Sequence, residues 1–276
     1  MTVVSSDSKP TKAVRACVLC GPAAASRPYA LVAGHGYSRC DDCGLIYQSE
    51  LPTREEFRDA YTGGVLKTWK RRLFAPFLRL NRTSGYGPGI QRAREIFKFA
   101  QSKLQQARPA AEGKILDVGC NKGYILAAAI EQEFDPWGIE FVPELLVPFR
   151  NTYPEYRSQV FSKKFSELRG VLQEASFDLI TAIDVVEHFE DPVADMKYLR
   201  QLLRPTGRLI VQTPDAGCDT ALSSGSNWGA MKPAEHLHLF DSTNFQRFAT
   251  ICGFSKVSFH PAFEEADGNF VAVLEP

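Results

Sequence analysis

The chain has 276 residues, 44% of them hydrophobic, and its 32 basic and 32 acidic residues give a formal net charge of zero. A chain of this size can bury a full α/β core plus a small additional module. No apolar run approaches the roughly 18 residues that a bilayer span requires, which excludes a helical membrane protein. Residues 1–13 are polar, are expected to be disordered, and lack the apolar core of a signal peptide. We therefore expect a cytoplasmic protein without disulfide bonds.

Two C-x-x-C-G motifs define the region 14–50. They place Cys17 and Cys20 in the first motif and Cys40 and Cys43 in the second. Four thiolates at this spacing are typical of a structural zinc ribbon, whose closed coordination shell leaves no position for catalysis. The alternatives are a redox-active C-x-x-C motif or four ordinary buried cysteines. The sequence thus predicts a structural Zn²⁺ site.

Residues 51–109 are predicted to form a helical linker that caps the substrate site. Helical character is present over 52–61 and 90–106, and the segment 67–94 contains eight basic residues and no acidic one. Such a segment could dock an anionic substrate, for example a phosphate- or nucleotide-linked sugar or RNA. It could equally be a solvated face that complements the acidic remainder of the chain. The sequence leaves both interpretations open.

An apolar strand over 114–116 leads into a glycine-bearing turn and a helix over 124–130. This is the pattern with which a doubly wound α/β domain opens its cofactor crevice. Gly119 would let the backbone approach a ligand, and Gly123 would open a helix whose N-terminal amides face the crevice. The G-x-x-x-G spacing differs from the G-x-G-x-x-G of NAD-binding proteins. The Asp117 carboxylate suits an amine-bearing ligand better than a pyrophosphate.

Further strands and helices follow in α/β order. A strand over 137–140 ends in Glu140, where such folds place the carboxylate that binds ribose hydroxyls. A strand over 177–183 precedes the pair Glu187-His188. A helix capped by Asp191 is expected to end at Gly207, before a strand over 208–214.

The C-terminal part begins with a long irregular link that contains Glu235 and His236. A helix over 242–252, ended by Gly253, follows it. Two strands over 254–260 and 269–274 complete the chain, and the last is expected to run antiparallel to the others.

These motifs resemble those of class I S-adenosylmethionine-dependent methyltransferases, whose first motif is often written D-x-G-C-G-x-G. Asn121 replaces the middle glycine. The resemblance covers 110–276 and implies a Rossmann-like, seven-stranded doubly wound sheet with its last strand antiparallel. It implies S-adenosylmethionine as cofactor, bound by Asp117, Gly119, Cys120, Asn121, Gly123, Tyr124, Glu140, Phe141, Phe165, Asp184 and Val185.

The catalytic residues are expected in the link after the fifth strand. Glu235-His236 matches the E-H pair of sugar and natural-product methyltransferases. We expect His236, oriented or charged by Glu235, to remove a proton from the acceptor, with His188 as the second candidate. Pro233 stands where the zinc-containing deoxysugar C-methyltransferases have a tyrosine, which weakens a C-methylation assignment.

Several functions remain open from the sequence. The first is O-methylation of a small molecule, most simply a sugar, glycan precursor or secondary metabolite. Alternatives are C- or N-methylation of a nucleotide-linked deoxysugar, RNA base methylation, and a non-catalytic binding module. The position after Ile183 lacks the N-P-P-[YF] signature of amino methylation, which disfavours RNA as the partner. The oligomeric state is not determined by any of these motifs.

We predict that the four cysteines bind one zinc ion per chain and hold residues 14–48 together. This segment is too short to bury a stable core unaided, so the metal should supply much of its folding free energy. Elemental analysis of carefully purified protein should find one equivalent of zinc. Protein without metal would contradict the prediction.

Overall fold

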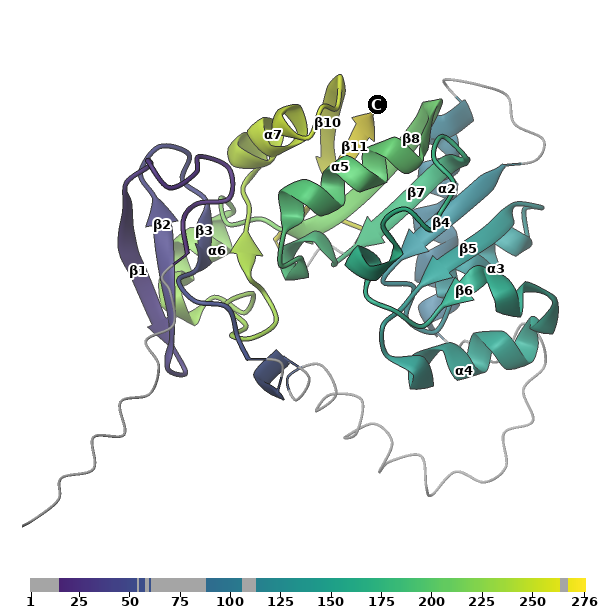
Figure 1. The fold of residues 1–276 in the computed structure, drawn as a ribbon, viewed down its shortest axis with the longest axis horizontal. Helices are drawn as coiled ribbons and strands as arrows, with labels where there is room; N and C mark the ends of the chain where they lie inside the picture. Colours follow the sequence, from purple (N-terminus) through teal and green to yellow (C-terminus); the bar gives the residue numbers. More distant parts are fainter. Residues whose placement is uncertain (1–14, 54, 58–59, 61–87, 106–112, 264–267) are drawn as a thin grey trace, which may run out of the picture.

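The computed structural model describes residues 15–53, 55–57, 60, 88–105, 113–263 and 268–276. The predicted disordered terminus and most of the basic segment, residues 67–87, lie outside the described residues. Two sheets form the fold, a small one at the N-terminal end and a large one flanked by helices (Figure 1). In the part that is described, no helix has the length and apolar character needed to cross a bilayer.

The large sheet has seven strands in the order β10-β11-β8-β7-β4-β5-β6. The strands are β4 (Lys114–Val118), β5 (Asp135–Ile139), β6 (Val160–Phe161), β7 (Phe177–Ile183), β8 (Leu203–Pro214), β10 (Lys256–Pro261) and β11 (Asn269–Glu275). Neighbouring strands from β6 to β8 pair in parallel, whereas β11 pairs antiparallel with both β8 and β10. The predicted fold class, including the antiparallel last strand, is confirmed.

Alternate residues of the central strands point into two helical layers, as expected for a sheet covered on both faces. Ile115 and Leu179 pack with α2 and α3, whereas Leu116 and Ile180 pack with α5 and α7. The helices are α2 (Pro88–Gln105), α3 (Tyr124–Ile130), α4 (Pro143–Thr152), α5 (Pro192–Leu202), α6 (Asp219–Ser224) and α7 (Ser242–Ile251). Short 3₁₀ helices are η1 (Pro154–Gln159), η2 (Phe165–Leu168), η3 (Val186–His188) and η4 (Gly225–Asn227).

Helix α5 begins as predicted but ends earlier. The Asp191 side chain accepts a hydrogen bond from the Ala194 amide, and Pro192 occupies the first turn. The helix stops at Leu202 rather than at Gly207, and β8 starts directly after it. The reason is Pro205, because a proline disfavours helical conformation at the residue before it and cannot donate a helical hydrogen bond.

The small sheet combines two distant parts of the chain. Strands β1 (Ser26–Val32), β2 (His35–Cys40) and β3 (Ile46–Gln48) come from residues 15–50, which we call the N-terminal module. The fourth strand, β9 (His238–Leu239), comes from the link after β8 and pairs antiparallel with β3. The sheet of the module is therefore completed by a strand that begins two residues after His236.

Candidate active site

The turn from β4 into α3 has left-handed backbone at three alternate positions. The φ angles are 71° at Gly119, 50° at Asn121 and 76° at Gly123. Asparagine tolerates positive φ better than other non-glycine residues. Asn121 therefore keeps the backbone path that the middle glycine of the motif would give. A Cβ atom at Gly119 would lie 2.5 Å from Cγ2 of Val185, so this position requires glycine.

Glu140 closes the turn from the neighbouring strand. Its carboxylate is buried and accepts hydrogen bonds from the backbone amides of Asn121, at 3.1 Å, and Val142, at 2.9 Å. Burial raises the pKa of Glu140, and the two amides oppose that shift. This places an acceptor-only group beside Gly119, as the binding of ribose hydroxyls requires.

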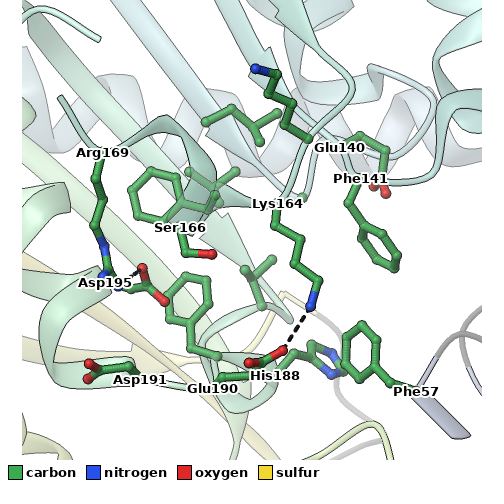
Figure 2. Close-up of a pocket in the computed structure, with 17 residues that line it drawn as sticks. Phe57, Glu140, Phe141, Lys164, Ser166, Arg169, His188, Glu190, Asp191 and Asp195 are labelled. Carbon is green, nitrogen blue, oxygen red and sulfur yellow. Dashed lines mark hydrogen bonds and ion pairs between the residues drawn. The ribbon is translucent and has the colours of Figure 1, made fainter. Parts of the chain in front are cut away.

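Two cavities of about 310 and 290 Å³ meet at this turn and share Gly119, Glu140 and Val185. Phe141, Phe165 and His188 line the larger cavity (Figure 2). Asp117, Cys120, Asn121, Tyr124 and Asp184 line the smaller one. Ten of the eleven residues expected to bind the cofactor therefore line this pair of cavities, and Gly123 caps α3 beside them.

The outer wall of the larger cavity holds residues that the sequence did not single out. Lys164 pairs with Glu190 at 2.8 Å and lies 5.0 Å above the ring of Phe57. Phe57 in turn lies 5.8 Å, between ring centroids, from Phe141 (Figure 2). Phe57 belongs to the predicted cap segment, and a short helical stretch brings it to the cavity mouth. The larger cavity thus has an aromatic and charged rim.

Asp117 lies at the base of the smaller cavity. Burial raises its pKa to about 7, with Glu140 adding to the shift, although the Thr181 hydroxyl donates to its carboxylate at 2.7 Å and opposes it. A nearby cation, such as the amine of a bound ligand, would restore the ionised form. The site is therefore suited to an amine and strained electrostatically without one.

Asp184 is held by donors from three elements. Its carboxylate accepts from Gln212 at 3.0 Å and from Asn269 at 3.2 Å, and Arg92 of α2 lies 3.5 Å away. Its backbone φ of 57° turns the chain so that Val185 covers Gly119. Arg92 belonged to the basic segment in the sequence, and here it faces an acid of the α/β domain.

His188 brings an imidazole to the larger cavity. Its Nδ1 lies 2.8 Å from the Glu235 carbonyl oxygen, which can only accept, so Nδ1 carries the proton and Nε2 is the basic nitrogen. Burial lowers the pKa of His188, so its ring is neutral at pH 7. Glu235 was expected to orient or charge His236, but the contact found here joins its backbone carbonyl to His188.

His236 and Glu187 surround His188 on its buried side. The rings of His236 and His188 meet edge to face at 4.8 Å, and His236 is only 5% exposed. Burial lowers the pKa of His236 to about 2 and raises that of Glu187 to about 8. The ligand atoms of these three residues lie within 4.8 Å of one another, close enough for a divalent cation. His236 is not among the residues that line the two cavities.

The four predicted zinc ligands converge in the N-terminal module. Their sulfur atoms lie within 4.8 Å of one another, and Cys17 and Cys43 are 3.6 Å apart. Tetrahedral Zn–S bonds of about 2.3 Å would separate sulfurs by about 3.8 Å. In both motifs the glycine has positive φ and its amide bonds to the first cysteine's carbonyl, Gly21 to Cys17 and Gly44 to Cys40. The donor set and its geometry fit zinc.

A family model described as a methyltransferase domain matches residues 91–258, more than half of the chain. The chain therefore belongs to the methyltransferase domain family, and it is a member of the S-adenosylmethionine-dependent methyltransferases.

Two curated relatives are named ubiquinone biosynthesis O-methyltransferase. The protein of Histophilus somni (strain 2336) is 29% identical over 171 residues, which cover 54% of this chain and 71% of that protein. The protein of Xylella fastidiosa (strain 9a5c) is 32% identical over 111 residues, which cover 38% of this chain and 43% of that protein. The chain spans less than half the length of the second relative.

Solved structures share the fold at low identity. A Burkholderia thailandensis 1,6-didemethyltoxoflavin-N1-methyltransferase, solved with its substrate and S-adenosylhomocysteine, matches with a TM-score of 0.54 and 15% identity, covering 90% of this chain and 98% of that chain. The CurJ carbon methyltransferase matches with a TM-score of 0.51 and 12% identity, covering 83% and 72%. Their names specify transfer to nitrogen and carbon, so the shared fold does not select the acceptor atom.

Replacing Glu140 should weaken cofactor binding. Losing a charge-assisted hydrogen bond costs about 1.5–3 kcal/mol, or roughly ten- to more than a hundredfold in affinity. Calorimetry with S-adenosylhomocysteine should show this loss for Glu140→Ala but not for Glu144→Ala, an exposed glutamate on α4. Equal affinity for folded Glu140→Ala and the wild type would mean that the ligand or the strand is misassigned.

Asp117→Asn should stabilise the cofactor-free protein in a pH-dependent way. The native pKa of about 7 exceeds the ordinary 3.8, so wild-type stability falls as the pH rises from about 4 to about 7. The asparagine does not ionise but can still accept from Thr181. Thermal unfolding between pH 5 and 8 should therefore show a gain in Tm for the variant that grows with pH and levels off above pH 7. A gain independent of pH would show that Asp117 is ionised throughout.

Proposed function

We propose that this methyltransferase transfers a methyl group to a hydroxyl oxygen of a small molecule, such as a sugar, a glycan precursor or a secondary metabolite. The O-methyltransferase names of the curated relatives support transfer to oxygen. The observation that carries the proposal is the neutral, oriented imidazole of His188 on the wall of the larger cavity. A hydroxyl acceptor needs such a base, whereas a thiolate or a free amine does not.

Bound S-adenosylmethionine would supply an electrophilic methyl group on a sulfonium. The residues around Gly119 and Glu140 would hold the cofactor so that its methyl group faces the acceptor oxygen, and the sulfur would leave with the electron pair of the carbon–sulfur bond. The acceptor proton passes to Nε2 of His188. The Glu235 carbonyl keeps the His188 ring oriented, and the buried, neutral ring of His236 packs against it. In-line positioning by the crevice supplies the larger part of the rate.

We also propose that the N-terminal module binds a structural zinc ion through Cys17, Cys20, Cys40 and Cys43. The support is the convergence of four free thiols at tetrahedral spacing. A closed four-sulfur shell has no open position for a substrate, so the metal stabilises the module without taking part in methyl transfer.

The acceptor should be identified by thermal-shift screening in the presence of S-adenosylhomocysteine. The panel should contain hydroxylated aromatic compounds, because the curated relatives are named for ubiquinone biosynthesis. It should also contain sugar phosphates and nucleotide sugars, which test for an anionic acceptor, and tRNA. Mass spectrometry of the product with its S-adenosylmethionine-derived methyl group then locates the modified atom. A product methylated on nitrogen or carbon would overturn the O-methylation proposal.

Removing the base should reduce turnover without affecting the cofactor. A general base contributes about 10² to 10⁴-fold, so His188→Gln should lower kcat at least a hundredfold while S-adenosylhomocysteine affinity changes less than about twofold. Because burial lowers the pKa of His188, kcat of the wild type should fall with decreasing pH only below pH 6.5. This acid limb of the pH profile should be absent from the variant.

The matched variant is His236→Asn, which removes the partner ring. If His188 is the base, His236→Asn lowers kcat less than His188→Gln and keeps the acid limb. A larger loss for His236→Asn, with the limb abolished, would assign the proton transfer to His236. A loss of under about fivefold for both variants would point to an acceptor that needs no base.

A further inference from the structure

Three successive backbone carbonyls around His236 accept hydrogen bonds, and two of the three donors belong to the N-terminal module. The carbonyl of Glu235 accepts from His188. The carbonyl of His236 accepts from the Tyr37 hydroxyl at 3.4 Å. The carbonyl of Leu237 accepts from the Gln48 amide at 3.0 Å. The segment that contacts the proposed base is therefore fixed by a part of the chain almost two hundred residues earlier.

The strand pairing continues these contacts. Ile46 and Tyr47 of β3 pair with Leu239 and His238 of β9, which has only two residues. The Leu237 amide donates to the Glu187 carbonyl at 2.8 Å, so the same segment is bonded to the η3 loop on its other side. A two-residue strand cannot hold its conformation alone, since an isolated pairing of this length is marginal in water. Its position therefore depends on β3.

Arg15 connects the three parts directly. Its guanidinium lies 2.9 Å from Nε2 of His238 and within 3.4 Å of the carbonyl oxygens of Gln48 and Glu190. Because a guanidinium can only donate, Nε2 of His238 is the acceptor nitrogen of a neutral ring. The Arg15 side chain thus links β3, β9 and Glu190, which lies two residues after His188.

The two regions also share one apolar core. Cys17, Leu19, Cys40, Leu45 and Tyr47 belong to the same buried cluster as Val211, Phe240 and Phe245. Tyr37, Gln48 and His238 are each at most 1% exposed. A change in the module is therefore transmitted to residues 235–239 through close-packed contacts and not through a flexible tether.

We infer that the N-terminal module is a positioning element of the methyl-transfer site, acting through Arg15, Tyr37 and the β3–β9 pairing on the segment that orients His188 and His236. This inference rests on the proposed function for the role of the two histidines. The module makes no contact of this kind with Gly119 or Glu140 among the residues described, so it should govern the acceptor side and leave cofactor binding unchanged.

Hydrogen exchange on the full-length protein tests the placement without any acceptor. Removing metal with a chelator should raise exchange at least tenfold in 231–240 and 187–190, and leave 114–118 unchanged. Calorimetry should find S-adenosylhomocysteine affinity within twofold of the untreated protein. Unchanged exchange in 231–240 would overturn the inference. An equal rise throughout the α/β sheet would also overturn it, because such a rise indicates general destabilisation.

The matched substitutions are Arg15→Met and Arg27→Met. Both remove a guanidinium from the module, but Arg27 is mostly exposed and pairs only with Asp41 among the described residues. Arg15→Met should reproduce the local rise in exchange, and Arg27→Met should not. In the Arg15→Met variant, chelation should raise the exchange rate in 231–240 by less than a further twofold. Full additivity would mean that Arg15 and the module act separately, which contradicts the inference.

Tyrosine variants separate positioning from packing. Tyr37→Phe removes the hydroxyl that reaches His236, whereas Tyr47→Phe removes one that reaches Ser26 inside the module. Once the acceptor is identified, Tyr37→Phe should lower kcat by about three- to tenfold at constant cofactor affinity. Tyr47→Phe should lower kcat by less than twofold. Equal effects would assign both tyrosines to packing. If His188→Gln retains activity while the exchange result holds, the proposed base is wrong and the positioning element stands.

Discussion

The backbone path from β4 into α3 is the constraint on which the rest of the site depends. Left-handed conformations at Gly119, Asn121 and Gly123 fold the chain back tightly enough for Val185 and Glu140 to reach it from neighbouring strands. A Cβ atom at Gly119 would clash with Val185, and one at Gly123 would clash with Phe149. The parallel strands then place every other functional group at the same edge of the sheet, where their carboxyl ends meet.

Burial sets the charge state of the groups around this edge. Asp117, Glu140 and Glu187 all have raised pKa values, and His188 and His236 have lowered ones, with desolvation as the largest cause in each case. The histidine rings are therefore neutral, whereas a cationic ligand would favour the ionised form of the acidic groups. The site is organised for a positively charged cofactor before any ligand binds.

The two sheets are coupled through a short strand. Because β9 begins two residues after His236, the small sheet of the N-terminal module also holds the segment beside the proposed base. Arg15 and Gln48 of the N-terminal module bond to the α/β domain through its main chain and a buried histidine. The four-cysteine cluster and the segment beside the proposed base are thereby linked through ordinary hydrogen bonds and packing.

The sequence by itself determined the order of strands and helices, the cofactor turn, Glu140 and the four-cysteine cluster. These depend on short-range patterns, such as glycine spacing, strand ends and C-x-x-C pairs, whose geometry is local. The end of α5 was predicted at Gly207 but lies at Leu202, although Pro205 is a local signal for the earlier end. Only the tertiary structure decided that His188 faces the cavity while His236 is buried, that Glu235 acts through its carbonyl, and that Phe57, Lys164 and Arg92 border the crevice. These features arise where segments distant in sequence pack together, and no periodicity or spacing within one segment encodes which side chain is then left facing the ligand.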